Sequence, residues 1–250
     1  MNDGTAETEY LHRCARQLAA GELPPGWDIV PSSPLSRVAC NTELKFFYKE
    51  FIVRSPLERL QAMLLGSRAS KARKQNDALL YVGIEAPVSV AWGKLAGGRE
   101  YLITRTAPGQ DVASWLKTTL ADRTGESLAR RRQLLEALGI FVGRVHATGF
   151  IAGDLQASNV IADLIEGRFQ FSLIDNERTV KILPPPGRAL LKNLMELNLL
   201  PPPVLSRTDR MRFFVAWRRQ MRELSPIEAK VVAAEAFHWA MRLMYERGQL

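Results

Sequence analysis

Residues 146–179 read HATGFIAGDLQASNVIADLIEGRFQFSLIDNERT, and this stretch decides the fold. It holds a polar loop in which Asp154 precedes Asn159 by five residues. Two apolar runs follow, at 159–162 and 169–174, and a Glu-Gly turn between them predicts a pair of strands. The second run ends at another aspartate, Asp175. The segment therefore predicts a helix end, a loop and two strands that bring two carboxylates and one carboxamide together.

These three side chains suit the transfer of a phosphoryl group. Negative charge spreads over the oxygens of the transferred group, so the protein positions the reactants and supplies Mg²⁺. An Asp followed five residues later by an Asn is typical of the catalytic loop of protein kinases. We therefore predict that Asp154 is the catalytic residue, which orients or deprotonates a hydroxyl, and that Asn159 and Asp175 bind Mg²⁺ through hard oxygen ligands. Taken alone, the Asp and Asn would be ordinary turn residues; their order among helix and strands favours the kinase interpretation.

The composition limits the class of protein. The chain has 250 residues, of which 46% are hydrophobic, enough for one large domain or two small lobes. Two cysteines and three scattered histidines indicate neither a disulfide framework nor a zinc site. The apolar runs are shorter than the roughly 20 residues that cross a bilayer, and the start of the sequence lacks the features of a signal peptide. We therefore expect a cytoplasmic protein.

The order of elements predicts an α+β protein with two lobes. A helix over 7–20 precedes several strand-like runs and a basic helix over 69–82, and from residue 111 onward the pattern is mainly helical. Strands first and helices later indicate a small β-rich N-lobe, residues 1–105, and a larger α-helical C-lobe, residues 106–250. The crevice between such lobes is the expected nucleotide site.

A nucleotide requires a cation on its phosphates, and the strand predicted over 44–53 offers two. Lys45 and Lys49 would share one face of that strand, because side chains alternate with period two. We choose Lys49, with Lys45 as the alternative; an exposed lysine on an edge strand is the competing interpretation. The loop over 31–36 has no glycine, so phosphate contacts there would come from Ser33 and Ser36 or from backbone amides.

Several motifs together resemble a known family. His146-x-x-Gly149, Gly153-Asp154-Leu-x-x-Ser-Asn159 and Leu173-Ile-Asp175, with the Tyr48-Lys49 strand, look like the lipopolysaccharide core kinases of the Kdo/WaaP and InaA type. The resemblance implies a bilobal protein-kinase-like fold and transfer of phosphate from ATP, with Mg²⁺, to a heptose or Kdo sugar of the inner core. It also implies that Lys49 clamps the phosphates, that Asp154 is the base, and that Asn159 and Asp175 hold the metal.

Three departures from the kinase pattern keep other functions open. Ala152 stands where many kinases have His, and Asp175 is followed by Asn-Glu instead of Phe-Gly. The basic helix also lacks a central glutamate to pair with Lys49; the candidates are Glu58, Asp77 and Glu177. The alternatives are a catalytically weak pseudokinase that acts as a nucleotide-dependent binding module, and a small-molecule phosphotransferase related to those acting on aminoglycosides or choline.

The net charge of +8 points to an anionic partner. We favour a lipid-linked anionic glycolipid acceptor at the inner face of the inner membrane, because no nucleic-acid-binding motif accompanies the charge and nucleic acid is not expected. The oligomeric state is left open. The positive residues cluster in three segments: Arg68, Lys71, Arg73 and Lys74; Arg130 to Arg132; and Arg207, Arg210, Arg212, Arg218, Arg219 and Arg222.

Overall fold

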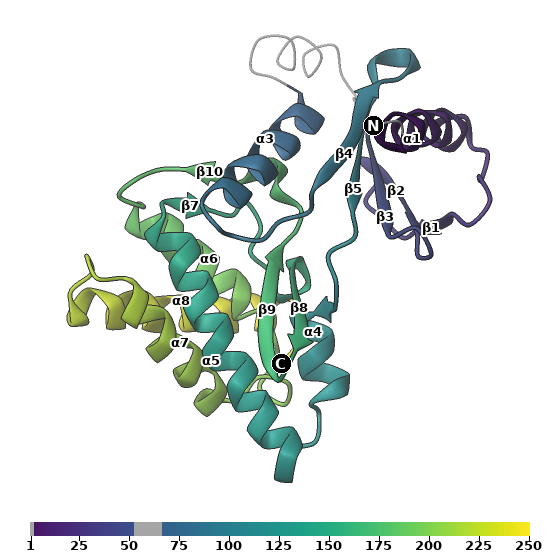
Figure 1. Ribbon diagram of the computed structural model, residues 1–250. Coiled ribbons are helices and arrows are strands. Elements are labelled where there is room, and N and C mark those ends of the chain that lie inside the picture. The colour runs from purple at the N-terminus through teal and green to yellow at the C-terminus, as the bar shows by residue number, and fades with distance from the viewer. Residues whose placement is uncertain (1–2, 53–66) are drawn as a thin grey trace. The chain divides into compact units, whose positions relative to one another are not determined.

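The computed structural model describes residues 3–52 and 67–250 (Figure 1). The chain forms two compact units, one up to Ala107 and the other from Pro108 onward. The first contains a five-stranded antiparallel sheet and the second is mainly helical, so the α+β class predicted from the sequence is confirmed. In the described part of the chain, no helix is both long and apolar enough to cross a bilayer.

The sheet of the first unit has the strand order β1-β2-β3-β5-β4, and every neighbouring pair is antiparallel. A long connection that contains helix α3 separates β3 from β4, and β5 then returns to pair with β3. The elements are α1 (Asp3–Ala20), β1 (Asp28–Val30), β2 (Ser36–Asn41), β3 (Phe46–Phe51), α3 (Arg68–Tyr81), β4 (Ser89–Lys94), the short helix η1 (Ala96–Gly98) and β5 (Glu100–Arg105).

A helix covers each face of this sheet, with α1 on one side and α3 on the other (Figure 1). Tyr48 and Ile103 are opposite each other in neighbouring strands and pack with the apolar side of α1. Phe51 and Leu102 point to the other face and pack with α3. Alternation along β3 therefore places Lys49 on the α3 face, because it has the same parity as Phe51.

A buried carboxylate fixes β3 against the end of α1. Glu50 is fully buried and accepts hydrogen bonds from Arg99 at 2.7 Å and from the hydroxyl of Tyr48 at 3.0 Å. Burial, more than the nearby Glu50 charge, raises the pKa of Tyr48, so the hydroxyl stays protonated as a donor. Arg99 also donates to the carbonyl of Ala19 in the last turn of α1. This network holds Glu50, the neighbour of Lys49 in β3, against the end of α1.

The second unit surrounds a long central helix, α5, with α7 packed along it (Figure 1). Two glycines of α5 permit this close packing: a Cβ atom on Gly139 would lie 2.3 Å from the carbonyl oxygen of Phe213, and one on Gly143 would lie 2.6 Å from Cβ of Gln220. The elements are β6 (Gln110–Asp111), α4 (Val112–Ser114), the π-helix η2 (Trp115–Thr119), α5 (Gly125–Ala147), β7 (Phe150–Ile151), η3 (Ala157–Asn159), β8 (Val160–Ile165), β9 (Arg168–Leu173), η4 (Asn176–Arg178), β10 (Val180–Lys181), α6 (Gly187–Leu197), α7 (Arg207–Gln220) and α8 (Pro226–Glu246).

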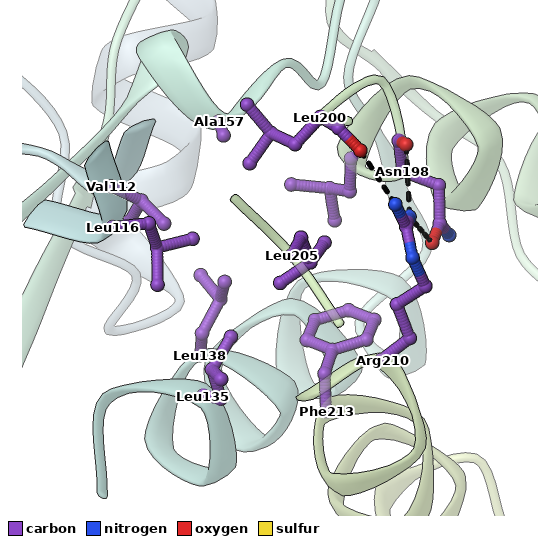
Figure 2. Close-up of a pocket in the computed structure, with 11 residues that line it drawn as sticks. Val112, Leu116, Leu135, Leu138, Ala157, Asn198, Leu200, Leu205, Arg210 and Phe213 are labelled. Carbon is purple, nitrogen blue, oxygen red and sulfur yellow. Dashed lines mark hydrogen bonds between the residues drawn. The ribbon is translucent and has the colours of Figure 1, made fainter. Parts of the chain in front are cut away.

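Two arginines of the predicted basic clusters are buried and do not belong to a charged surface. Arg131 forms an ion pair with Asp209 at 3.1 Å, and the guanidinium of Arg210 donates to the carbonyl oxygens of Asn198 at 2.9 Å and Leu200 at 2.5 Å. Figure 2 shows these bonds of Arg210 beside a small apolar cavity of about 20 Å³. Burial lowers the pKa of Arg210 to about 10, which leaves the side chain charged at neutral pH. Both arginines join helices instead of attracting an external partner.

Candidate functional site

The loop that carries Asp154 lies beside the segment that follows Asp175. Strand β7 leads into the loop and pairs antiparallel with β10, with Ile151 opposite Val180. Gly149 adopts a φ of 85°, which favours glycine, and its carbonyl accepts a hydrogen bond from the amide of Ile182 at 2.8 Å. The segments before and after the β8–β9 hairpin, which contain β7 and β10, are thus held side by side.

The side chain of Asp154 is held at both oxygens. Asn159 donates from Nδ2 to the main-chain carbonyl of Asp154 at 3.0 Å and to its Oδ2 atom at 3.4 Å. Gln156 donates to Oδ1 at 2.9 Å. The carboxylate is half-buried, so it is fixed in direction and still reaches solvent. Because the amide nitrogen of Asn159 faces Asp154, Oδ1 of Asn159 is its candidate metal ligand.

Asp175 lies directly after Ile174 in a left-handed backbone conformation, with φ 60° and ψ 48°. This conformation is uncommon for a residue other than glycine, and such strain occurs often at functional sites. The amide of Ile174 donates to the carbonyl of Asn159 at 3.0 Å, which joins the segments of the two predicted metal ligands. The next residue, Asn176, is buried and donates to the carbonyl of Leu173 at 2.6 Å. Asn176 therefore anchors the position at which many kinases have phenylalanine.

Gly153 permits contact between the loop and the turn after Asp175. A Cβ atom at this position would lie 2.1 Å from Cβ of Arg178 and 2.9 Å from its carbonyl oxygen. No larger residue fits without moving one of the two backbones. Close contact with Arg178 thus explains why a glycine precedes Asp154, the predicted catalytic residue.

Three side chains of α6 hold the loop by its backbone. Asn193 accepts from the amide of Ala152 at 3.1 Å and donates to the carbonyl of the same residue at 2.8 Å. Glu196, which is only 7% exposed, accepts from the amide of Leu155 at 3.0 Å. Lys192 donates to the carbonyl of Gly153 at 2.8 Å and pairs with Glu196 at 2.9 Å. Sequence reasoning missed these residues; the available signal was three polar residues at helical spacing, 192, 193 and 196, of which Asn193 and Glu196 are buried among the leucines of α6.

Replacing Glu196 with alanine is expected to loosen this loop. The amide of Leu155 then loses its buried acceptor, and the loop that carries Asp154 shifts. For the predicted catalytic role of Asp154 in phosphoryl transfer, we expect kcat to fall by about 10-fold or more, because misplacement of about 1 Å can cost about 10²-fold. Hydrogen exchange at Leu155 should become faster, and Glu196→Gln should restore part of both effects. The control is Glu223→Ala at an exposed position. Unchanged exchange at Leu155 would contradict the assignment of Glu196 as a positioning residue.

His146 is fully buried beneath this loop. Its Nδ1 atom accepts a hydrogen bond from Nε1 of Trp217 at 3.0 Å, so the proton is assigned to Nε2, which faces Oδ1 of Asn193 at 3.3 Å. Burial lowers the pKa of His146 to about 4, and the hydrogen bond to Asn193 opposes this shift only in part. The neutral imidazole therefore supports the α6 contacts and does not transfer protons near neutral pH.

The buried histidine predicts a loss of stability in acid. Its pKa is 6.5 when unfolded and about 4 when folded, so its contribution is complete above pH 6.5 and is lost as the pH falls toward 4. The loss amounts to about 3 kcal/mol in the free energy of unfolding. Urea unfolding at a series of pH values, compared with His146→Gln, measures it. Equal pH dependence in the two proteins would show that His146 does not titrate in this way.

In the first unit, Lys49 and Lys45 occupy different structural settings. Lys49 lies in β3, half-buried, with its Nζ atom 5.4 Å from the ring centre of Phe51. Lys45 lies in the turn before β3 with a φ of 58°. The prediction that both lysines share one face of a single strand is wrong, because Asn41 pairs with Phe46 and residues 42–45 form the hairpin turn. Of the two lysines, Lys49 is therefore the one that lies within a strand, as the prediction of a phosphate-binding lysine requires.

Ser33 and Ser36 lie at the loop between β1 and β2. Their hydroxyl oxygens are 3.2 Å apart, and the amide of Ser36 donates to the carbonyl of Ser33 at 3.0 Å. Ser33 is exposed and Ser36 is half-buried. The two residues form a tight turn, and their contact with phosphate stays a prediction.

The acidic partner of Lys49 also stays a prediction. Asp77 is exposed, whereas the α3 residues that pack with Phe51 are Ala69 and Ala72. This arrangement disfavours Asp77. Glu58 lies outside the described residues, and Glu177 belongs to the second unit.

The predicted metal ligands fit Mg²⁺ in their chemistry. Asp175 is exposed at the end of its strand, and both it and Asn159 would offer oxygen atoms. In residues 3–52 and 67–250, no group of three or more His, Cys, Asp or Glu side chains could hold a metal ion. Mg²⁺ commonly uses one or two protein carboxylates and completes its shell with phosphate and water, so a sparse oxygen set of this kind suits it.

Comparisons with known proteins agree with the kinase interpretation. The family model described as the lipopolysaccharide kinase (Kdo/WaaP) family matches residues 44–216. Among solved structures, WaaP in complex with acyl carrier protein matches with a TM-score of 0.63 and 18% identity, over 88% of each chain. This likeness confirms the predicted kinase-like fold. The bifunctional kinase-methyltransferase WbdD matches with a TM-score of 0.48 and 16% identity, over 84% of this chain and 50% of that one. No curated protein matches.

Proposed function

Because the chain belongs to the lipopolysaccharide kinase (Kdo/WaaP) family, we propose that it transfers the γ-phosphoryl group of ATP to a sugar hydroxyl of the lipopolysaccharide inner core. The acceptor sugar would be a heptose or Kdo. The observation that carries this proposal is the loop at Asp154, whose carboxylate is oriented by Asn159 and whose backbone is held by α6. A loop fixed in this way suits a reaction that depends on positioning.

Each predicted site residue has a defined role in the proposed reaction. The carboxylate of Asp154 accepts a hydrogen bond from the sugar hydroxyl, directs its oxygen toward the γ-phosphorus and takes its proton as the new P–O bond forms. ADP leaves with the electrons of the broken bond. Lys49 would neutralise charge on the phosphates of ATP, with Ser33 and Ser36 as further contacts. These nucleotide contacts rest on family resemblance and on the position of β3.

Mg²⁺ would be held by Oδ1 of Asn159 and by the carboxylate of Asp175. It would supply charge neutralisation on the phosphate oxygens during transfer. The backbone at Asp175 is left-handed and so breaks from the extended conformation of the strand that precedes it. The bond from Ile174 to Asn159 keeps the two ligand segments together.

The proposed acceptor is lipid-linked and anionic, which agrees with the net charge of +8. Such an acceptor would be reached at a membrane surface. A protein partner is a further candidate, since the similar WaaP structure holds acyl carrier protein.

A pseudokinase is the second candidate function, and one observation favours it. The buried residues of α3 are Ala69, Ala72, Asn76 and Leu79, and none of them is acidic, so this helix departs from the kinase pattern of a central inward-facing glutamate. The other two departures weigh less. The backbone of Ala152 is held by Asn193 without a histidine at that position, and Asn176 is anchored by its own hydrogen bonds.

An acceptor panel tests the proposed function. The full chain is incubated with γ-³²P-labelled ATP, Mg²⁺ and purified cores that end at Kdo or at heptose, and in parallel with an aminoglycoside and choline. Label in one of the cores supports the proposal and identifies the sugar. Label in the cationic small molecules alone would assign a small-molecule phosphotransferase.

A further inference from the structure

Helix α7 has an exposed ridge that the fold does not use. Successive helical residues rotate by about 100°, so four of its residues lie within about 80° of one another. All four are exposed, and the two apolar ones, Met211 and Val215, are 57% and 43% exposed. We call this set the α7 ridge: Arg207, Met211, Val215 and Arg218.

The inner face of α7 accounts for its folding. Phe213 and Trp217 are buried, and the helix begins with a capping box formed by Ser206 and Asp209. Met211 and Val215 are therefore not needed for the core. Two large exposed apolar side chains between arginines indicate a surface that is covered in function.

Hollows flank the ridge on both sides, and both are rich in positive charge. One, of about 530 Å³, is lined by Arg212 and Arg219 beside the ridge; its single acidic residue, Glu136, lies 3.9 Å from Arg219. The other, of about 590 Å³, lies between α7 and α8 and is lined by Phe214, Phe237 and Lys230 among others, with no acidic residue among the described residues that line it. Arg207 and Met211 border both hollows.

We propose that the α7 ridge docks on an anionic lipid bilayer. Arginines near such a surface are attracted to the negative headgroups, and the side chains of Met211 and Val215 would enter the boundary between headgroups and acyl chains. A lipid surface is favoured over nucleic acid, because the two apolar side chains of the ridge are aliphatic, whereas bases stack on exposed aromatic rings, and Phe214 and Phe237 in the neighbouring hollow are only half-exposed. The inference deepens the proposed function, since a lipid-linked acceptor lies in such a bilayer.

Vesicle binding tests the proposal without ATP, so its result is independent of phosphoryl transfer. The full chain is mixed with vesicles of phosphatidylcholine alone or with added phosphatidylglycerol, and the bound fraction is measured by flotation. The wild type should bind only the anionic vesicles. Arg207→Gln with Arg218→Gln should lower the partition coefficient by about 30-fold, the effect of losing two cations near an anionic surface.

The matched control removes two exposed cations from α3, as Lys71→Gln with Lys74→Gln, and should change binding by less than about 3-fold. Met211→Ser with Val215→Ser should abolish the part of binding that resists high salt. Absence of binding by the wild type, or equal losses in the ridge and α3 variants, would overturn the proposal. Capture of an acidic protein by the ridge without vesicle binding would also overturn it in favour of a protein partner.

Discussion

Asp154→Ala is expected to lower kcat for phosphoryl transfer by about 10²–10⁴-fold, the usual contribution of a positioned acid–base group. KM for ATP should change little, because the carboxylate acts on the sugar hydroxyl during transfer. The residue is half-buried, and its contacts are to Asn159 and Gln156 within the same loop, so the fold should persist. Initial rates of labelled product formation, with circular dichroism as a check on folding, measure the effect.

The matched control is Asp163→Ala, which removes a half-buried aspartate from β8. Among the contacts described, the carboxylate of Asp163 accepts a single hydrogen bond, from the amide of Leu164. That variant should retain the wild-type rate. If Asp154→Ala turned over as fast as Asp163→Ala, Asp154 would not be the catalytic residue.

Arg131→Met is expected to reduce the free energy of unfolding by about 3–5 kcal/mol, the usual cost of breaking a buried ion pair. Arg131 is 1% exposed, binds the carboxylate of Asp209 and donates to the carbonyls of Leu116, Leu120 and Val204. Burial alone would raise the pKa of Asp209, but hydrogen bonds from Arg131 and Ser206 lower it. The variant therefore leaves a buried charge and three carbonyls without their donor.

Urea unfolding measures the change, with Arg132→Met as the control. Arg132 is adjacent on α5 but exposed, so its replacement should stay within about 0.5 kcal/mol of the wild type. Equal unfolding midpoints for the two variants would show that the buried pair does not stabilise the second unit.

The hairpin that carries the candidate site was predictable because its signals are local. The strands β8 and β9 follow directly from apolar runs separated by a Glu-Gly turn, and Asn159 bonds to Asp154 only five residues away. The resemblance between the Gly-Asp loop and kinases then gave the fold, which the WaaP structure confirms. The catalytic and metal-binding roles stay predictions.

Contacts between distant residues were not predictable in the same way. Asn193 and Glu196 each bind the backbone of a loop residue 41 positions away. Hydrophobic periodicity predicts helices and strands, but it does not predict contacts between residues so far apart in the sequence. Arg131 looked like one of three adjacent surface arginines, yet each helical step turns the side chain by about 100°, so only this one faces inward. Lys45 was misplaced because the hairpin turn extends two residues further than the strand pattern indicated, so β3 begins at Phe46 and not at residue 44.

The most direct test of the account is whether the wild-type chain transfers the γ-phosphoryl group of ATP to lipopolysaccharide core in a Mg²⁺-dependent manner. The account predicts label in the glycolipid with Mg²⁺, and none with chelator or in Asp154→Ala and Asp175→Ala. ATP binding without transfer to any core acceptor would contradict it and would favour the pseudokinase.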